Sequence, residues 1–137
     1  MTEKSRGAFP KTMPSLARAQ RATEWASEFG FDWPSVDPVW KKVEEELGEL
    51  KAAVASGDHR RAGEETGDLL LSLVNLSRFL NVEAEDALSD AVERFLTRFA
   101  HVEKQIQAQG RKLSQATLAE MDAFWEEAKT LERRDKR

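Results

Sequence analysis

Apolar residues recur at three- and four-residue spacing along most of the chain, and no segment alternates between apolar and polar residues as a strand would. The pattern predicts an all-α protein. Residues of the kind that end helices interrupt the pattern and fit positions just past helix ends; these are Gly30, Gly57, Asn81 and Gly110. We therefore predict five helices, over about 14–29, 38–56, 59–80, 83–109 and from 118 into the charged end of the chain.

Capping residues precede several of these helices. Asp37 followed by Pro38 predicts the start of the second helix, and Asp58 can cap the third. Thr117 and Glu120 have the S/T-x-x-E spacing of a capping box at the start of the fifth.

The third helix contains a segment, residues 69–80 (LLLSLVNLSRFL), that is apolar almost all the way round. Such a helix is enclosed on most sides. Because so few helices can cover it, we expect a second copy of the chain to do so, in a homodimer or a homotetramer. The fold expected is a four- to five-helix bundle that dimerisation completes.

Length and composition limit the possibilities further. With 137 residues, we expect one domain over 13–132, a flexible tail at 1–12 and a charged tail at 133–137. A net charge of -4 argues against nucleic-acid binding, and no apolar run reaches the length of a membrane span. These features predict a soluble protein of the cytoplasm. The absence of cysteine excludes disulfides, thiolate zinc sites and a cysteine nucleophile.

Two pairs of carboxylates stand at the edges of the apolar stripes. Glu46 and Glu49 are three residues apart on the second helix, and Glu65 and Asp68 are three apart on the third. On a helix this spacing lets both side chains of a pair converge. Like charges so close raise one another's pKa, and a hard divalent cation with oxygen ligands relieves the repulsion. The pattern therefore predicts a site for Mg²⁺ or Mn²⁺.

The same acids could instead form a solvated face paired with nearby basic residues; these are Lys41, Lys42, Arg60 and Arg61. A di-iron carboxylate bundle requires Glu-x-x-His, but Ser56 and Arg98 stand three residues before the two histidines. Neither a Ser-His-Asp arrangement nor a glycine-rich phosphate loop can be argued.

In order, these motifs resemble the MazG-type nucleoside triphosphate pyrophosphohydrolases of the all-α NTP pyrophosphatase superfamily. The family signature EExxE followed by ExxD reads here Glu45-Glu46-Leu-Gly-Glu49 and Glu65-Thr-Gly-Asp68. The stretch VERFLTRFAHVE is similar to the family's KFxxRF segment, and MDAFWEEAK to its closing helix. The resemblance extends over about residues 14–129.

The resemblance implies Mg²⁺-dependent hydrolysis of a (d)NTP between the α and β phosphates, which yields a (d)NMP and pyrophosphate. The metal ligands it implies are Glu46, Glu49, Glu65 and Asp68, with Glu45 beside them. Glu45 and Glu46 are the expected catalytic residues, and Glu45 is the candidate for orienting or deprotonating the attacking water. The substrate-binding residues it implies are Arg61, Arg94, Arg98, Trp125 and Lys129. Arg94 replaces the family's usual lysine, and Val92 stands where asparagine is frequent.

Several alternatives stay open at this point. Arg94 and Arg98 could pair with Glu93 or Glu103 on a wet face, and Trp125 could belong to the core. Trp33 is interpreted as a packing residue, with closure over a base as the alternative. The whole chain could also be a non-catalytic helical dimer that acts as a regulatory or partner-binding module. The preferred base and sugar are not encoded in a recognisable motif.

Overall fold

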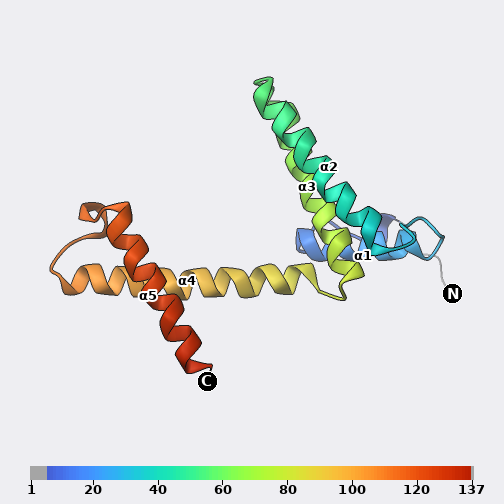
Figure 1. The fold of residues 1–137 in the computed structure, drawn as a ribbon. Helices are drawn as coiled ribbons and strands as arrows, with labels where there is room; N and C mark the ends of the chain where they lie inside the picture. Colours follow the sequence, from blue (N-terminus) through green and yellow to red (C-terminus); the bar gives the residue numbers. More distant parts are fainter. Residues whose placement is uncertain (1–5, 137) are drawn as a thin grey trace. The chain divides into compact units, whose positions relative to one another are not determined.

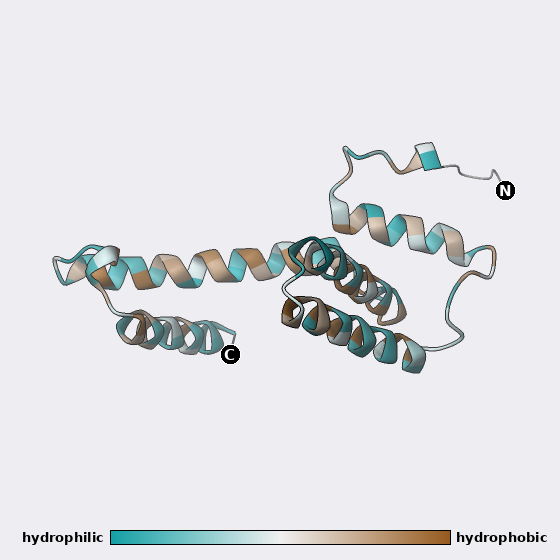
Figure 2. Ribbon diagram, turned by 90° about the horizontal axis from the view of Figure 1, so that it is seen from above, coloured by the Kyte–Doolittle hydropathy of each residue, from teal (hydrophilic) through white to brown (hydrophobic). Residues whose placement is uncertain are grey.

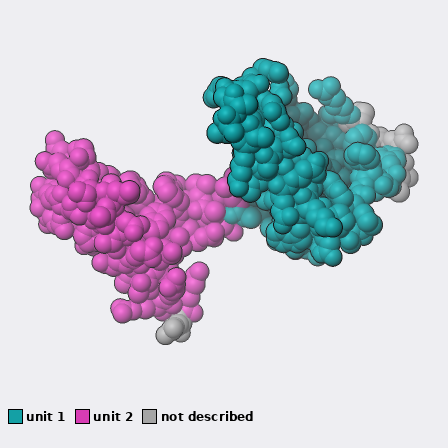
Figure 3. Space-filling model, turned by 45° about the horizontal axis from the view of Figure 1, so that its top comes forward, with its two compact units in different colours: residues 1–87 teal, residues 88–137 magenta. Residues whose placement is uncertain are grey.

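The computed structural model describes residues 6–136, so residues 1–5 of the expected flexible tail and Arg137 lie outside the described residues. The described part contains five α-helices, two short 3-10 helices and no strand. The all-α prediction is confirmed. The chain divides into two compact units, residues 1–87 and 88–137 (Figure 3), which are taken in turn. Along residues 6–136, none of the helices combines the length and the apolar character that crossing a membrane requires.

The first unit contains three helices, which are α1 (Ser15–Ser27), α2 (Val36–Ala55) and α3 (His59–Phe79), and the first residues of α4 (Ala84–Ala108). α2 and α3 lie side by side as a helical hairpin, and α1 packs against α3 (Figure 1). α2 and α3 carry four buried apolar side chains, which are Val39, Ala53, Val74 and Leu76.

The ends of α2 and α3 agree with the expected signals except at one point. Asp58 caps α3, because its Oδ1 accepts a hydrogen bond from the backbone N–H of Arg61 at 3.0 Å. Asn81 adopts the left-handed conformation expected just past this helix, with φ of 57°. The start of α2 was predicted wrongly. Ser35 is its N-cap, and Asp37 and Pro38 lie inside the first turn, where a proline is tolerated because those N–H groups have no helical partner.

α1 is tied to the segment that leads into α4. The side chain of Gln20, which is 3% exposed, donates to the carbonyl of Val82 at 2.9 Å and accepts from the N–H of Ala84 at 2.8 Å. Before α1, Phe9 is buried against the ring of Trp25, with 5.6 Å between ring centroids. The described end of the expected N-terminal tail therefore contacts the first unit.

The second unit consists of the rest of α4, a loop with the 3-10 helix Leu113–Gln115, and α5 (Leu118–Asp135). Val102 and Ile106 of α4 are almost fully buried, together with Ala128 of α5. The expected charged tail is partly helical, since α5 runs to Asp135. The expected domain limits themselves stay a prediction.

Residues 6–136 leave part of the apolar segment of α3 exposed. Ser72, Val74, Asn75 and Leu76 are buried, but Leu70 is 50% exposed and its neighbours Leu71 and Leu73 are exposed as well. Figure 2 shows brown, apolar residues along the α2–α3 hairpin. Cover by a second copy therefore stays a prediction.

The start of α5 gives a prediction about acid stability. The predicted capping box is confirmed: the Thr117 hydroxyl accepts from the N–H of Glu120 at 3.2 Å, and the Glu120 carboxylate accepts from the N–H of Thr117 at 3.3 Å. A hydrogen bond from Arg111, and then the one from the Thr117 backbone, lower the pKa of Glu120 from 4.5 to about 2. A carboxyl group with a lowered pKa stabilises the fold above its unfolded pKa and loses this effect as pH falls through the folded one.

We therefore expect the difference in unfolding midpoint between wild type and Glu120→Gln to shrink as pH falls from 4.5 towards 2. Urea unfolding followed by far-UV circular dichroism at several pH values measures it. Glu126→Gln, at an exposed carboxylate of the same helix, controls for the loss of one charge. A difference that stays constant over this pH range would contradict the prediction.

Candidate metal centre

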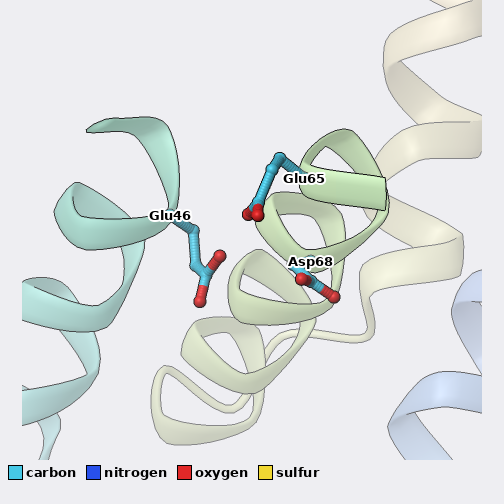
Figure 4. A group of neighbouring side chains, drawn as sticks. All are labelled: Glu46, Glu65 and Asp68. Carbon is cyan, nitrogen blue, oxygen red and sulfur yellow. The ribbon is translucent and has the colours of Figure 1, made fainter. Parts of the chain in front are cut away.

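Three carboxylates from two helices meet in the first unit. α2 contributes Glu46, and α3 contributes Glu65 and Asp68 (Figure 4). One carboxylate oxygen of each residue lies within 4.8 Å of those of the other two. Glu46 borders the apolar face of α2 and is only 8% exposed. Packing of this face along α3 therefore brings its carboxylate next to those of Glu65 and Asp68.

The electrostatics of the cluster are unfavourable for a set of bare carboxylates. Partial desolvation raises the pKa of Glu65, and the negative charges of Glu46, Asp68 and Glu49 raise it further, against an opposing effect of Arg61. Charge is partly balanced elsewhere in the cluster. The Nζ of Lys42 lies 2.9 Å from a Glu46 carboxylate oxygen, and this contact raises the pKa of Lys42.

Two acids of the EExxE motif lie apart from the three. Glu49 forms an ion pair with Arg61, at 3.2 Å between Oε2 and Nη2. Glu45 is exposed, with an oxygen 3.6 Å from the Nζ of Lys42. Both predicted arrangements are therefore represented, because the acids converge as in a metal site and also pair with neighbouring basic residues. Lys42 was not singled out as a site residue, although its spacing of four residues from Glu46 is visible in the sequence.

The donor set fits a hard cation. Carboxylate oxygens without cysteine or histidine are the ligands that Mg²⁺ and Mn²⁺ prefer. Opposite ligands of an octahedral Mg²⁺ are about 4.2 Å apart, twice the usual metal–oxygen distance of about 2.1 Å. The oxygens of Glu46, Glu65 and Asp68 lie no more than 4.8 Å from one another, so small side-chain movements would place them around one ion.

The second unit holds the other predicted substrate-binding residues. Arg98 forms a bidentate ion pair with Glu132 of α5, with Nη2 at 2.9 Å and Nε at 3.1 Å, and its Cζ lies 5.6 Å from the ring centroid of Trp125. The partner of Arg98 is therefore neither Glu93 nor Glu103, and Glu132 was not predicted from the sequence. Trp125 packs on Phe95, with 5.3 Å between ring centroids.

Trp125 and Phe95 line an apolar hollow of about 270 Å³ in the second unit. Arg94 is exposed, and Lys129 lies 3.8 Å from a carboxylate oxygen of Glu126. A hydrogen bond from Arg98 lowers the pKa of Glu132 and, reciprocally, raises that of Arg98. Asp122 is the charged residue of the lining, and Arg98 lies beside the ring of Trp125.

The described residues form an all-α fold in which a helical hairpin carries three converging carboxylates, a donor set that suits a divalent metal. Residues 36–106 match the family described as "MazG nucleotide pyrophosphohydrolase domain". The chain belongs to this family. The matched range contains all the carboxylates of both motifs.

Relatives extend the similarity beyond this range. The chain is 46% identical over 123 residues to a Thermotoga maritima protein, "Nucleoside triphosphate pyrophosphohydrolase/pyrophosphatase MazG", and 39% identical over 126 residues to the Escherichia coli K12 "Nucleoside triphosphate pyrophosphohydrolase". Each alignment covers 90% of this chain, and 47% and 48% of the relatives respectively. A Bacillus subtilis protein, "Uncharacterized protein YabN", is 41% identical over 70 residues, 51% of this chain and 14% of that protein. The chain thus spans about half the length of the first two relatives.

Proposed function

We propose that this chain hydrolyses nucleoside triphosphates between the α and β phosphates, with Mg²⁺ or Mn²⁺ as cofactor, and serves nucleotide-pool housekeeping in the cytoplasm. The observation that carries the proposal is the convergence of Glu46, Glu65 and Asp68 from α2 and α3. Membership of the MazG family and the names of the Thermotoga maritima and Escherichia coli relatives support the same reaction.

The carboxylates would hold the metal next to the scissile phosphate. A bound divalent ion would polarise the phosphoryl oxygen and offset the repulsion between substrate and acids. Glu49, three residues after Glu46, would join the ligands by turning from Arg61 towards the cluster. Glu45 is exposed beside Glu46, and it would orient the attacking water and accept its proton.

The basic residues would bind the phosphates. Arg61, when released from Glu49, would donate to phosphate oxygens, and its five N–H groups suit that geometry. In the second unit we assign phosphate binding to Arg94 and Arg98. Trp125 and Lys129 are assigned nucleotide contacts by resemblance to family positions.

We further propose that the working form is a homodimer or homotetramer. Large apolar residues are exposed on α3 and on α4, and burying them would contribute roughly 25 cal/mol per Å². Those on α3 are Leu70, Leu71 and Leu73, and those on α4 are Leu88, Val92, Phe95, Leu96 and Phe99. Such an amount of exposed apolar surface is unusual for a monomer.

The reaction is tested by product analysis. Purified chain is incubated with each NTP and dNTP plus Mg²⁺, and the products are separated by ion-exchange chromatography. We expect monophosphate and pyrophosphate, loss of turnover when EDTA removes the metal, and recovery when Mg²⁺ or Mn²⁺ is added back in excess. Diphosphate and phosphate as products would contradict the assigned bond.

The same assay separates this proposal from its alternative. A non-catalytic regulatory module would release no pyrophosphate from any nucleotide with either metal. Isothermal titration with Mn²⁺ then shows whether the cluster binds a metal in the absence of turnover. Absence of both turnover and metal binding would overturn the assignment of the three carboxylates.

A further inference from the structure

A hollow of about 380 Å³ lies in the first unit between α1, the α1–α2 loop and α3. Three alanines and Thr23 of α1 form one wall, and residues 31–33 of the loop, with Trp33 among them, contribute another. Leu71, Asn75 and Arg78 of α3 complete the lining. Sites for small ligands have this size and character, mostly apolar with few polar groups that fix orientation. The family motifs do not include this hollow.

Asn75 of α3 is a polar residue of this lining, and its amide nitrogen is free to donate hydrogen bonds. Its side chain is buried, and its Oδ1 accepts from Arg78 Nη2 at 2.7 Å and Nε at 3.2 Å. Arginine can only donate, so this contact fixes which end of the amide faces Arg78. Within residues 6–136, Nδ2 of Asn75 has no hydrogen-bond partner and is not sealed from solvent. Asn75 therefore presents N–H donors to the hollow.

Arg78 also holds the aromatic wall. It makes a bidentate ion pair with Asp32, at 2.9 and 3.0 Å, and Asp32 directly precedes Trp33. The Arg78 side chain is 9% exposed, and its hydrogen bond lowers the pKa of Asp32. One partly buried arginine thus fixes the amide and anchors the loop that carries the indole. Aromatic faces in such positions stack on nucleobases.

The hollow is aligned with the metal cluster along α3. Asp68, Leu71 and Asn75 follow one another at intervals of three and four residues, and therefore lie along one stripe of the helix. Seven residues from Asp68 to Asn75 correspond to a rise of about 10.5 Å. This is comparable with the reach of a nucleotide from its α-phosphate to the far edge of its base.

We propose that this hollow is the nucleobase subsite, in which Trp33 stacks on the base and the Asn75 amide donates to a ring carbonyl. Uracil, thymine, guanine and cytosine carry such a carbonyl, and adenine does not. The subsite therefore favours carbonyl-bearing bases over adenine. The inference rests on the proposed function for the triphosphate chemistry, but the binding of a base can be tested without turnover.

Asn75→Asp is the decisive substitution. It keeps an oxygen acceptor for Arg78 but replaces the donor by a carboxylate oxygen, which repels a carbonyl. We expect kcat/KM for dUTP or dGTP to fall on the order of 10- to 100-fold relative to that for dATP. Asn81→Asp, the same chemical change at an exposed asparagine outside the hollow, should leave the ratio unchanged.

A binding measurement makes the result independent of catalysis. Titration calorimetry with dUMP and dAMP in EDTA compares wild type, Asn75→Asp, Trp33→Ala and Trp125→Ala. The proposal expects wild type to bind dUMP more tightly, Asn75→Asp to lose that preference, and Trp33→Ala to weaken both ligands. A preference abolished by Trp125→Ala but unaffected by Asn75→Asp would overturn it. If the wild type prefers dUMP but hydrolyses no triphosphate, the subsite proposal stands and the proposed reaction is refuted.

Discussion

Glu65→Gln should reduce turnover of nucleoside triphosphates at least about 100-fold, the range seen when one preorganised electrostatic group is removed from a catalytic site. The substitution keeps the shape of the side chain but removes one negative charge, that of a proposed metal ligand, from the α2–α3 cluster. The same change should not lower stability. The pKa of Glu65 is raised in the folded protein, so its negative charge is unfavourable there, and a neutral amide removes this repulsion.

Lower activity together with an equal or higher thermal midpoint is therefore the expected combination, a trade-off typical of catalytic sites. Glu64→Gln is a matched control, because it removes one charge from the adjacent position, where Glu64 is exposed and pairs with Arg60. Pyrophosphate release and Mn²⁺ affinity of the three proteins are measured, together with thermal unfolding in EDTA, where no bound metal offsets the repulsion. Undiminished turnover by Glu65→Gln would exclude Glu65 as a metal ligand.

Ile106→Ala should destabilise the second unit by about 2–5 kcal/mol. Ile106 is 0% exposed, so truncation removes buried methyl groups and leaves a cavity that neighbouring side chains only partly fill. Ile106→Val, which deletes one methylene, should cost about 0.5–1.5 kcal/mol. Urea unfolding followed by far-UV circular dichroism gives both values.

The control for this series is Leu118→Ala in the same unit. Leu118 is 79% exposed, so its truncation should change stability by no more than about 0.5 kcal/mol. If Ile106→Ala were as mild as this control, the packing of α4 against α5 would be looser than the structure indicates. If Ile106→Val were as severe as Ile106→Ala, a shape defect rather than the lost volume would be responsible.

Helix positions and most ends were predictable because their signals are local. Asp58, Asn81 and the Thr117–Glu120 box behave as their sequence context indicates, since a cap involves only residues a few positions apart. The start of α2 was misassigned because Ser35 and Asp37 are both good caps. A proline is acceptable anywhere in a first turn, so Pro38 does not discriminate between them.

The carboxylate cluster was predictable in part for the same reason. The i, i+3 spacing places Glu65 and Asp68 together, and hairpin packing of α2 on α3 adds Glu46. Spacing along α2 did not decide whether Glu49 joins the carboxylate cluster or pairs with Arg61, because Arg61 lies within reach across the hairpin. Two ion pairs between more distant residues were not predicted. The ion pairs Asp32–Arg78 and Arg98–Glu132 join residues 46 and 34 positions apart.

The location of Asp68 and Asn75 on one uninterrupted helix has a consequence for how the family can vary. Insertion of a single residue between them would rotate Asn75 by about 100° around α3 and displace it by about 1.5 Å, which would turn it away from the hollow. Loops elsewhere in the chain can change length without this effect. On the proposed assignment, variation in base preference should therefore arise by exchange of side chains at Asn75 and Trp33, while the number of residues between Asp68 and Asn75 remains constant.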